Sequence, residues 1–162
     1  MIKRSYFDQF DGPGWPEPKQ LERFFIAPRG QEWSYKGGND SWGLSAEGLN
    51  GTENLPFNDQ SSVDLSMIGN SDHGVYLWYS KWDGRLKRKS SYAAKGDLSR
   101  LVEFVESLHG DPLSIGLFVP FPMAWKAVKE FIERDGELPK SIEWLRAEDI
   151  PPEAFPDPGA PR

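Results

Sequence analysis

The sequence predicts an α+β fold, with a mostly antiparallel β-sheet and two main helices packed on one face. Short segments rich in aromatic and β-branched residues alternate with Gly-, Pro- and Asn-rich turns through the first half of the chain. Apolar residues at helical spacing appear only in the second half, on both sides of a short apolar run. Because the strands come as a group before the helices, we expect hairpin connections and not a parallel βαβ arrangement.

Turn residues divide the first half of the chain into strand-like segments. Residues 31–36 and 42–49 flank a Gly-Gly-Asn-Asp sequence, and we expect them to form a hairpin. Residues 21–26 are too few for the apolar period to decide between helix and strand. Residues 62–68 carry apolar side chains at every second position, which predicts a half-buried strand.

A second hairpin is predicted around Asp83-Gly84, because Asp-Gly between two strand-like runs is a strong hairpin signal. It joins residues 75–82 to residues 85–92. One face of this hairpin would be aromatic on the first strand and basic on the second. A two-residue turn predicts these cross-strand pairs: Trp82 with Arg85, Ser80 with Lys87, Trp78 with Lys89, and Tyr76 with Ser91.

The second half predicts a helix, a strand, a helix and a last strand. Asp97 is a good N-cap for a helix that ends near Gly110. Residues 113–119 form an uninterrupted apolar run, as expected of a strand covered on both faces. A second helix is expected over residues 124–135, and residues 141–145 then form a short strand.

The length of 162 residues favours one domain, which we place at residues 1–150, followed by an extended Pro-rich tail at residues 151–162. The chain lacks an apolar run long enough for a membrane span, and its first residues do not have the pattern of a secretory signal. We therefore expect a cytoplasmic protein without a membrane partner.

Net charge is −6, but residues 81–95 carry +5, so the remainder of the chain carries −11. An acidic surface favours basic partners and repels nucleic acid. The basic hairpin still permits an alternative, a single-stranded nucleic-acid-binding module in which aromatic rings stack on bases and cations hold phosphates. The residues of that alternative are Trp78, Trp82, Arg85, Lys87 and Lys89. We prefer a protein-contact face or a guarded sheet edge, because the net charge opposes nucleic acid.

Residues that would support catalysis or cofactor binding do not form recognisable motifs. The chain contains no Cys, and His73 and His109 lack the neighbours of a catalytic triad or metal site. We therefore predict no catalytic residue, no metal and no cofactor. A hydrolase built on paired carboxylates stays open as a third interpretation, although a solvated acidic face is favoured. The carboxylates concerned are Glu32, Asp40, Glu47, Asp59, Asp64 and Glu143.

The stretch GLFVPFPMAWKAVKEFIERDGELPKSIEWL, residues 116–145, resembles the closing block of a known family. In that block a strand leads to a helix with an A-V-x-x-F core, then to a Gly/Pro turn and a short strand ending in Glu-Trp or Asp-Trp. GVYLWYSKWDG and GDLSRLVEF, earlier in the chain, also fit, so the resemblance covers residues 74–146. The family is the first-numbered immunity-protein family of bacterial polymorphic toxin systems.

The resemblance implies an α+β protein without enzymatic activity. It would bind a cognate toxin, most often a nucleic-acid deaminase, in the cytoplasm and occlude the toxin's active site. An acidic inhibitor associates quickly with a basic toxin cleft. We expect the contacts to lie on exposed loops and strands. The candidate toxin-binding residues are Asp40, Trp42, Glu47, Glu53, Asp59, Trp82 and Asp83.

Overall fold

In the computed structural model, residues 1–7, 10–26, 33 and 40–157 can be described. The main sheet has eight strands in the order β10-β6-β5-β4-β3-β1-β2, with β9 paired to β5, and every pairing is antiparallel. The strands of the main sheet are β1 (Ile2–Tyr6), β2 (Gly12–Pro13), β3 (Ser41–Leu49), β4 (Ser61–Asn70), β5 (Gly74–Asp83), β6 (Arg88–Ala94), β9 (Phe118–Val119) and β10 (Trp144–Arg146). A separate small sheet pairs β7 (Phe104–Glu106) with β8 (Pro112–Ser114).

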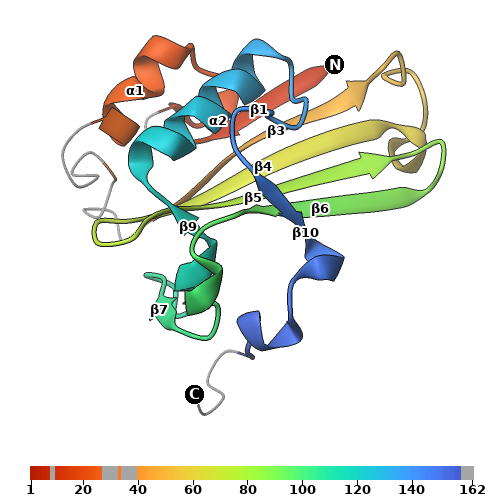
Figure 1. The fold of residues 1–162 in the computed structure, drawn as a ribbon. Helices are drawn as coiled ribbons and strands as arrows, with labels where there is room; N and C mark the ends of the chain where they lie inside the picture. The colour runs from red at the N-terminus through yellow and green to blue at the C-terminus, as the bar shows by residue number, and fades with distance from the viewer. Residues whose placement is uncertain (8–9, 27–32, 34–39, 158–162) are drawn as a thin grey trace.

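Helices α1 (Pro18–Ile26) and α2 (Phe121–Glu133) lie together on one face of the main sheet (Figure 1). The α+β class with helices on an antiparallel sheet is thus confirmed. The ambiguous segment 21–26 is helical, and α2 forms where the sequence predicts a helix. A last strand also forms, but β10 retains only residues 144 and 145 of the strand predicted over 141–145. Neither described helix is long and apolar enough to cross a membrane.

Aromatic rings fill the layer between the sheet and the helices. The rings of Trp33 and Trp42 stack with centroids 4.3 Å apart and an interplanar angle of 15°. Trp33 lies directly on β4 at Gly69, where an added Cβ would come within 2.3 Å of the indole ring. Phe7, Phe24, Phe25, Trp125 and Phe131 complete this buried layer.

Strand β4 shows how the alternation of side chains divides the sheet into two faces. Val63, Leu65 and Met67 are buried under the helices, as their period of two predicts. The residues between them point to the opposite face. Figure 1 shows that α1 and α2 leave this second face open, and that the C-terminal segment lies below it.

The end of α2 is fixed to the sheet by Tyr79 of β5. The Tyr79 hydroxyl donates a 2.8 Å hydrogen bond to the carbonyl oxygen of Gly136, and burial raises the pKa of this hydroxyl. Gly136 has φ +90° and donates its amide to the carbonyl of Phe131. A glycine is needed here because this left-handed conformation terminates the helix.

The predicted helix that begins after Asp97 is wrong. Asp97 does cap a helix, but this is a 3-10 helix of three residues, Leu98–Arg100, and β7 follows it. Backbone carbonyls that would accept hydrogen bonds within an α-helix accept them here from residues distant in the sequence. The Glu103 carbonyl accepts the amide of Ile115 at 2.8 Å, and the Leu101 carbonyl accepts the Ser114 hydroxyl at 2.8 Å. The strand predicted over 113–119 is likewise interrupted, by a 3-10 turn at Ile115–Leu117.

The predicted two-residue turn at Asp83-Gly84 is also wrong. Asp83 pairs with Arg88, so residues 84–87 form the turn and the register on β6 shifts by four residues. The Asp83 carboxylate accepts the amides of Arg85 and Leu86 at 2.9 and 3.2 Å, and Lys87 adopts φ +51°. The observed pairs are Trp82 with Lys89, Ser80 with Ser91, and Trp78 with Ala93.

The predicted hairpin between residues 31–36 and 42–49 does not form along β3. Residues 43–47 pair with β1 on one edge and with β4 on the other, which leaves no free edge there. Apart from Trp33, residues 31–36 lie outside the described part of the chain. Their prediction as a strand is therefore not tested.

The start of the Pro-rich tail packs against the molecule as far as it is described. Ile150 and Ala154 are buried with Ala93 and Leu117 in a second apolar cluster. The Phe155 ring meets Trp78 edge-on, with centroids 5.8 Å apart. This segment therefore covers part of the sheet face that the helices leave open.

Phe131 offers a direct test of the aromatic layer. Its ring is fully buried and contacts Trp15 and Tyr79, at centroid distances of 4.9 and 6.1 Å. We expect Phe131→Ala to lower the free energy of unfolding by about 3–5 kcal/mol, because it leaves a cavity. Phe57→Ala, at a residue that is 67% exposed, is the matched control and should cost less than about 0.5 kcal/mol in urea denaturation. Equal losses in both variants would contradict this packing.

Candidate functional site

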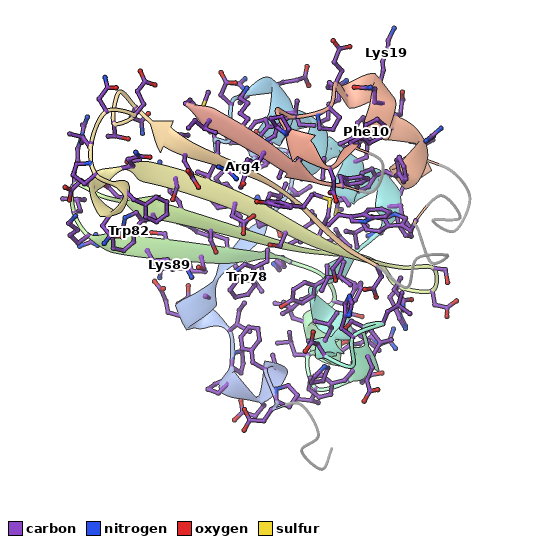
Figure 2. All side chains as sticks on the ribbon, turned by 180° about the vertical axis from the view of Figure 1, so that it is seen from behind. Arg4, Phe10, Lys19, Trp78, Trp82 and Lys89 are labelled. Carbon is purple, nitrogen blue, oxygen red and sulfur yellow. The ribbon has the colours of Figure 1, made fainter. Side chains whose placement is uncertain are left out.

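The open face of the main sheet carries the best candidate for a functional surface. Figure 2 views the molecule from this side, and Arg4, Trp78, Trp82 and Lys89 lie across the face. The face spans β1, β3, β4, β5 and β6, which corresponds to about 19 Å between the outer two strands. Part of it is hollowed, with a volume of about 600 Å³.

The strand register places the side chains of this face in three rows that run across the five strands. The middle row consists of Arg4, Ser45, Asp64, Ser80 and Ser91. The row on one side consists of Ile2, Glu47, Ser62, Trp82 and Lys89. The row on the other side consists of Tyr6, Gly43, Ser66, Trp78 and Ala93.

Asp64 lies at the centre of these rows, surrounded by serines. Ser45 and Ser80 are its cross-strand neighbours, and Ser62 and Ser66 are two residues away on β4. We call these four residues the serine ring. Because serine is small and the larger residues lie further out, the sheet is hollow around the carboxylate. The hollow thus results from the small size of the four serines that surround Asp64.

The environment of Asp64 disfavours its negative charge. Partial burial in the hollow raises the pKa of Asp64, while the hydrogen bond from Ser66, at 3.4 Å, and the positive charge of Lys89 act in the opposite direction. Among the described residues, no cation forms a salt bridge with this carboxylate. The Asp64 side chain is exposed to solvent, so its desolvation is partial, and it has no salt-bridge partner among the described residues.

Aromatic side chains form the rim of the hollow. Tyr6 is 55% exposed and Phe57, in the loop between β3 and β4, is 67% exposed. Trp82 is half-buried, and its indole donates a 3.0 Å hydrogen bond to the Asn58 carbonyl, which fixes the ring at the edge of the sheet. Fixed, partly exposed aromatics of this kind are typical of protein-binding surfaces.

Two of the predicted toxin-binding residues, Asp40 and Trp42, are not on the surface. Trp42 is 4% exposed and belongs to the aromatic layer. Asp40 is 5% exposed, and its carboxylate accepts the Leu108 amide at 3.0 Å. The expectation that both are exposed at a hairpin turn is therefore wrong. The Trp42 ring packs against Phe24 of α1, and Asp40 is bound by the amides of Gly69 and Leu108. That Asp40 and Trp42 contact the toxin stays a prediction.

Glu47 and Glu53 lie on the surface in different settings. Glu47 is half-buried on the open face, in the row next to Asp64. Glu53 is exposed and binds the amino terminus at 2.6 Å, an ion pair that lowers the pKa of this carboxyl. Of these two carboxylates, only Glu47 therefore lies on the same face as the hollow.

The other three predicted residues gather at the tip of the β5–β6 hairpin. Asp59 forms an ion pair with Lys87, and Asp83 binds the turn amides described above. Trp82 is the member of this group that faces the hollow. Of the seven candidates, Glu47 and Trp82 line the hollow with their side chains.

The cations of the proposed nucleic-acid hairpin are mostly committed to contacts within the protein. Arg85 donates to the Asn50 carbonyl at 3.1 Å. Lys87 binds the Asn58 carbonyl as well as Asp59. Lys89 stays exposed beside Trp82. Two of these three cations, Arg85 and Lys87, therefore fasten the preceding loop to the hairpin.

The carboxylates of the hydrolase interpretation do not form one site. Asp40 is buried, Asp59 pairs with Lys87, Glu143 pairs with Lys95, and Glu32 lies outside the described residues. Asp64 and Glu47 share the open face. Within the described part of the chain, no three His, Asp or Glu side chains are close enough to hold a metal ion.

Comparison with protein families gives a match over nearly the whole chain. The family model described as immunity protein Imm1 matches residues 5–146. The match covers both helices and, on the open face, strands β3, β4, β5 and β6 with the last two residues of β1. Neither the curated proteins nor the solved structures give a match.

Substitution of Asp64 should show whether its negative charge lowers the stability of the folded protein. Because the folded-state pKa is raised above the ordinary value of 3.8, the charged carboxylate disfavours folding once the pH exceeds the raised value. We expect Asp64→Asn to raise the midpoint of thermal unfolding near pH 7. The difference should vanish near about pH 3, where the carboxyl is protonated in both states.

Asp97→Asn is the matched control for this measurement. Hydrogen bonds from Ser99 lower the pKa of Asp97, so its charge stabilises the folded state above pH 3.8 and this contribution is lost as the pH falls through the lowered value. We expect this variant to lower the midpoint near pH 7, the opposite direction. A fall in the midpoint of Asp64→Asn at neutral pH would contradict the assignment.

Proposed function

Because the chain belongs to the Imm1 family of immunity proteins, we propose that it blocks the active site of a cognate toxin and that this toxin is a nucleic-acid deaminase. Membership of this family implies toxin neutralisation by a protein that is not an enzyme. The open, hollowed face of the sheet is the observation that supports binding by occlusion.

The open face has the properties that a toxin-binding surface requires. It is about 19 Å wide, rimmed by exposed aromatics, and it is not covered by α1 or α2. A stable protein–protein interface needs about 800 Å² on each partner, with a few aromatic or charged anchors near its centre. The open face supplies a charged residue near its centre, Asp64, and its rim supplies the aromatic residues.

Charge supports a partner that itself binds nucleic acid. The chain carries a net charge of −6. A toxin that acts on DNA or RNA must present a basic cleft to phosphates, and an acidic inhibitor is steered toward that cleft by the same charges. Binding there would exclude the substrate directly, without a conformational change in the toxin.

The deaminase assignment follows the usual pairing of this family. A deaminase that acts on nucleic acid takes the target base into a pocket, so a protein that covers the pocket entrance suffices to stop the reaction. The chain needs no cofactor for such a role. It would act in the cytoplasm of the producing cell, where the toxin meets nucleic acid.

The proposal is tested with the cognate toxin domain. We expect co-expression of the chain to restore growth of cells that produce the toxin. In vitro, an equimolar amount of the chain should abolish deamination of single-stranded DNA or RNA, and the inhibition should be competitive with nucleic acid. The association rate should fall as salt rises from about 50 to about 500 mM, because steering is screened.

Two results would count against the proposal. A toxin that stays active in a stable complex with the chain would exclude occlusion. A toxin that modifies no base would exclude the deaminase assignment while leaving neutralisation intact. As a control, the chain alone should not shift single-stranded DNA at about 50 mM salt, which a nucleic-acid-binding module would do.

A further inference from the structure

We infer that the hollow on the open face receives an arginine side chain of the toxin, and that Asp64 with its serine ring binds the guanidinium. This inference rests on the proposed function and names the residue at the centre of the interface. It commits the hollow to one occupant, a basic side chain on a protruding part of the partner.

The shape of the hollow fits an inserted side chain. Four serines, Ser45, Ser62, Ser66 and Ser80, replace the larger residues that usually cover a sheet face, so the exposed side chain of Asp64 stands within a depression of about 600 Å³. A flat partner surface that rests on the rim would leave much of this volume unfilled. A long side chain reaches it from a partner that rests on the rim.

The chemistry of the hollow fits a guanidinium. A carboxylate accepts two parallel hydrogen bonds from arginine, and the serine hydroxyls can accept from its other N–H groups. Arginine is also weakly hydrated in comparison with lysine, and its planar group stacks well on aromatic rings. Trp82 and Phe57 stand at the rim where such stacking would occur.

The electrostatics of the free protein support the same occupant. Asp64 has no salt-bridge partner among the described residues, and the desolvation that raises its pKa is a cost that an incoming cation would offset. Glu47, in the adjacent row, adds a second negative charge. Arg4 and Lys89 lie at the outer ends of their rows, where they suit acidic groups of the partner at the edge of the contact.

Asp64→Asn removes the charge with almost no change in shape. We expect its affinity for a catalytically inactive form of the toxin domain to fall by at least about 30-fold, measured by calorimetry, because a buried toxin cation would lose its partner. The midpoint of thermal unfolding should not fall, which separates lost binding from lost folding. Asp72→Asn, at an exposed residue in the β4–β5 turn, makes the same change in net charge and should keep wild-type affinity.

Filling the hollow gives a second, independent variant. Ser62 lines the hollow and makes no side-chain hydrogen bond within the described structure, so Ser62→Leu should block the arginine while the sheet stays folded. The control is Ser90→Leu, on the opposite face of β6. Replacement of the contacting toxin arginine by Ala should then cost little further affinity in the Asp64→Asn background, because both changes remove one interaction.

The outcomes separate this inference from the proposed function. If the wild-type chain neutralises the toxin but Asp64→Asn and Ser62→Leu bind as tightly as wild type, the arginine site is wrong and the immunity function stands. If the wild-type chain does not bind the toxin at all, both are overturned. Loss of affinity in the two variants, with both controls unchanged, supports the site.

Discussion

The packing of aromatic rings between the sheet and the two helices determines which face of the sheet is available for binding. Trp33, which is stacked on Trp42, lies on the glycine at position 69, and the rings around this pair close the layer to solvent. Because side chains alternate along a strand, burial of one face assigns every intervening residue to the other. The serines and Asp64 are therefore presented together as a consequence of how the core is packed.

Features that depend on local pattern could be predicted from the sequence. The alternation over residues 62–68 and the helical spacing after Pro122 each report burial on one side of an element, and both are confirmed. The segment after Asp97 has helical spacing as well, but its carbonyls bond to Ser114 and Ile115 across a loop. Sequence spacing carries no information about such distant partners, so the helix prediction there is wrong.

The hairpin turn shows a similar limit at shorter range. Asp83-Gly84 is a strong turn signal, and a turn does form after Asp83. Its length depends on two amides that the Asp83 side chain binds and on the left-handed conformation of Lys87. Because an error in turn length displaces every pair along the strands, the predicted neighbours of Trp82 and Trp78 are wrong, although both residues do share one face.

The sequence singles out some residues of the candidate site but does not predict how they come together. Asp64 is one of six carboxylates that the sequence singles out, and Trp82 and Glu47 are among the predicted toxin-binding residues. The serine ring has no signal along the chain, because its members come from three strands and are polar residues of a common type. They form a site only through the cross-strand register, which places them around Asp64. Asp40 and Trp42 are not surface residues, because Trp42 packs against the α1 aromatics and Asp40 binds Gly69 of β4 and Leu108 of the β7–β8 turn.

The distribution of charge explains why the basic hairpin and the acidic chain do not conflict. Arg85 and Lys87 bind the loop that contains Asn50, Asn58 and Asp59, so these cations are used to hold the rim of the hollow in place. Trp82 is anchored to the same loop through Asn58. Asp64 forms no salt bridge with any cation of the described residues, and desolvation raises its pKa against the opposing effects of Ser66 and Lys89. The Asp64 carboxylate is therefore available to pair with a cation of the partner, as the arginine site requires.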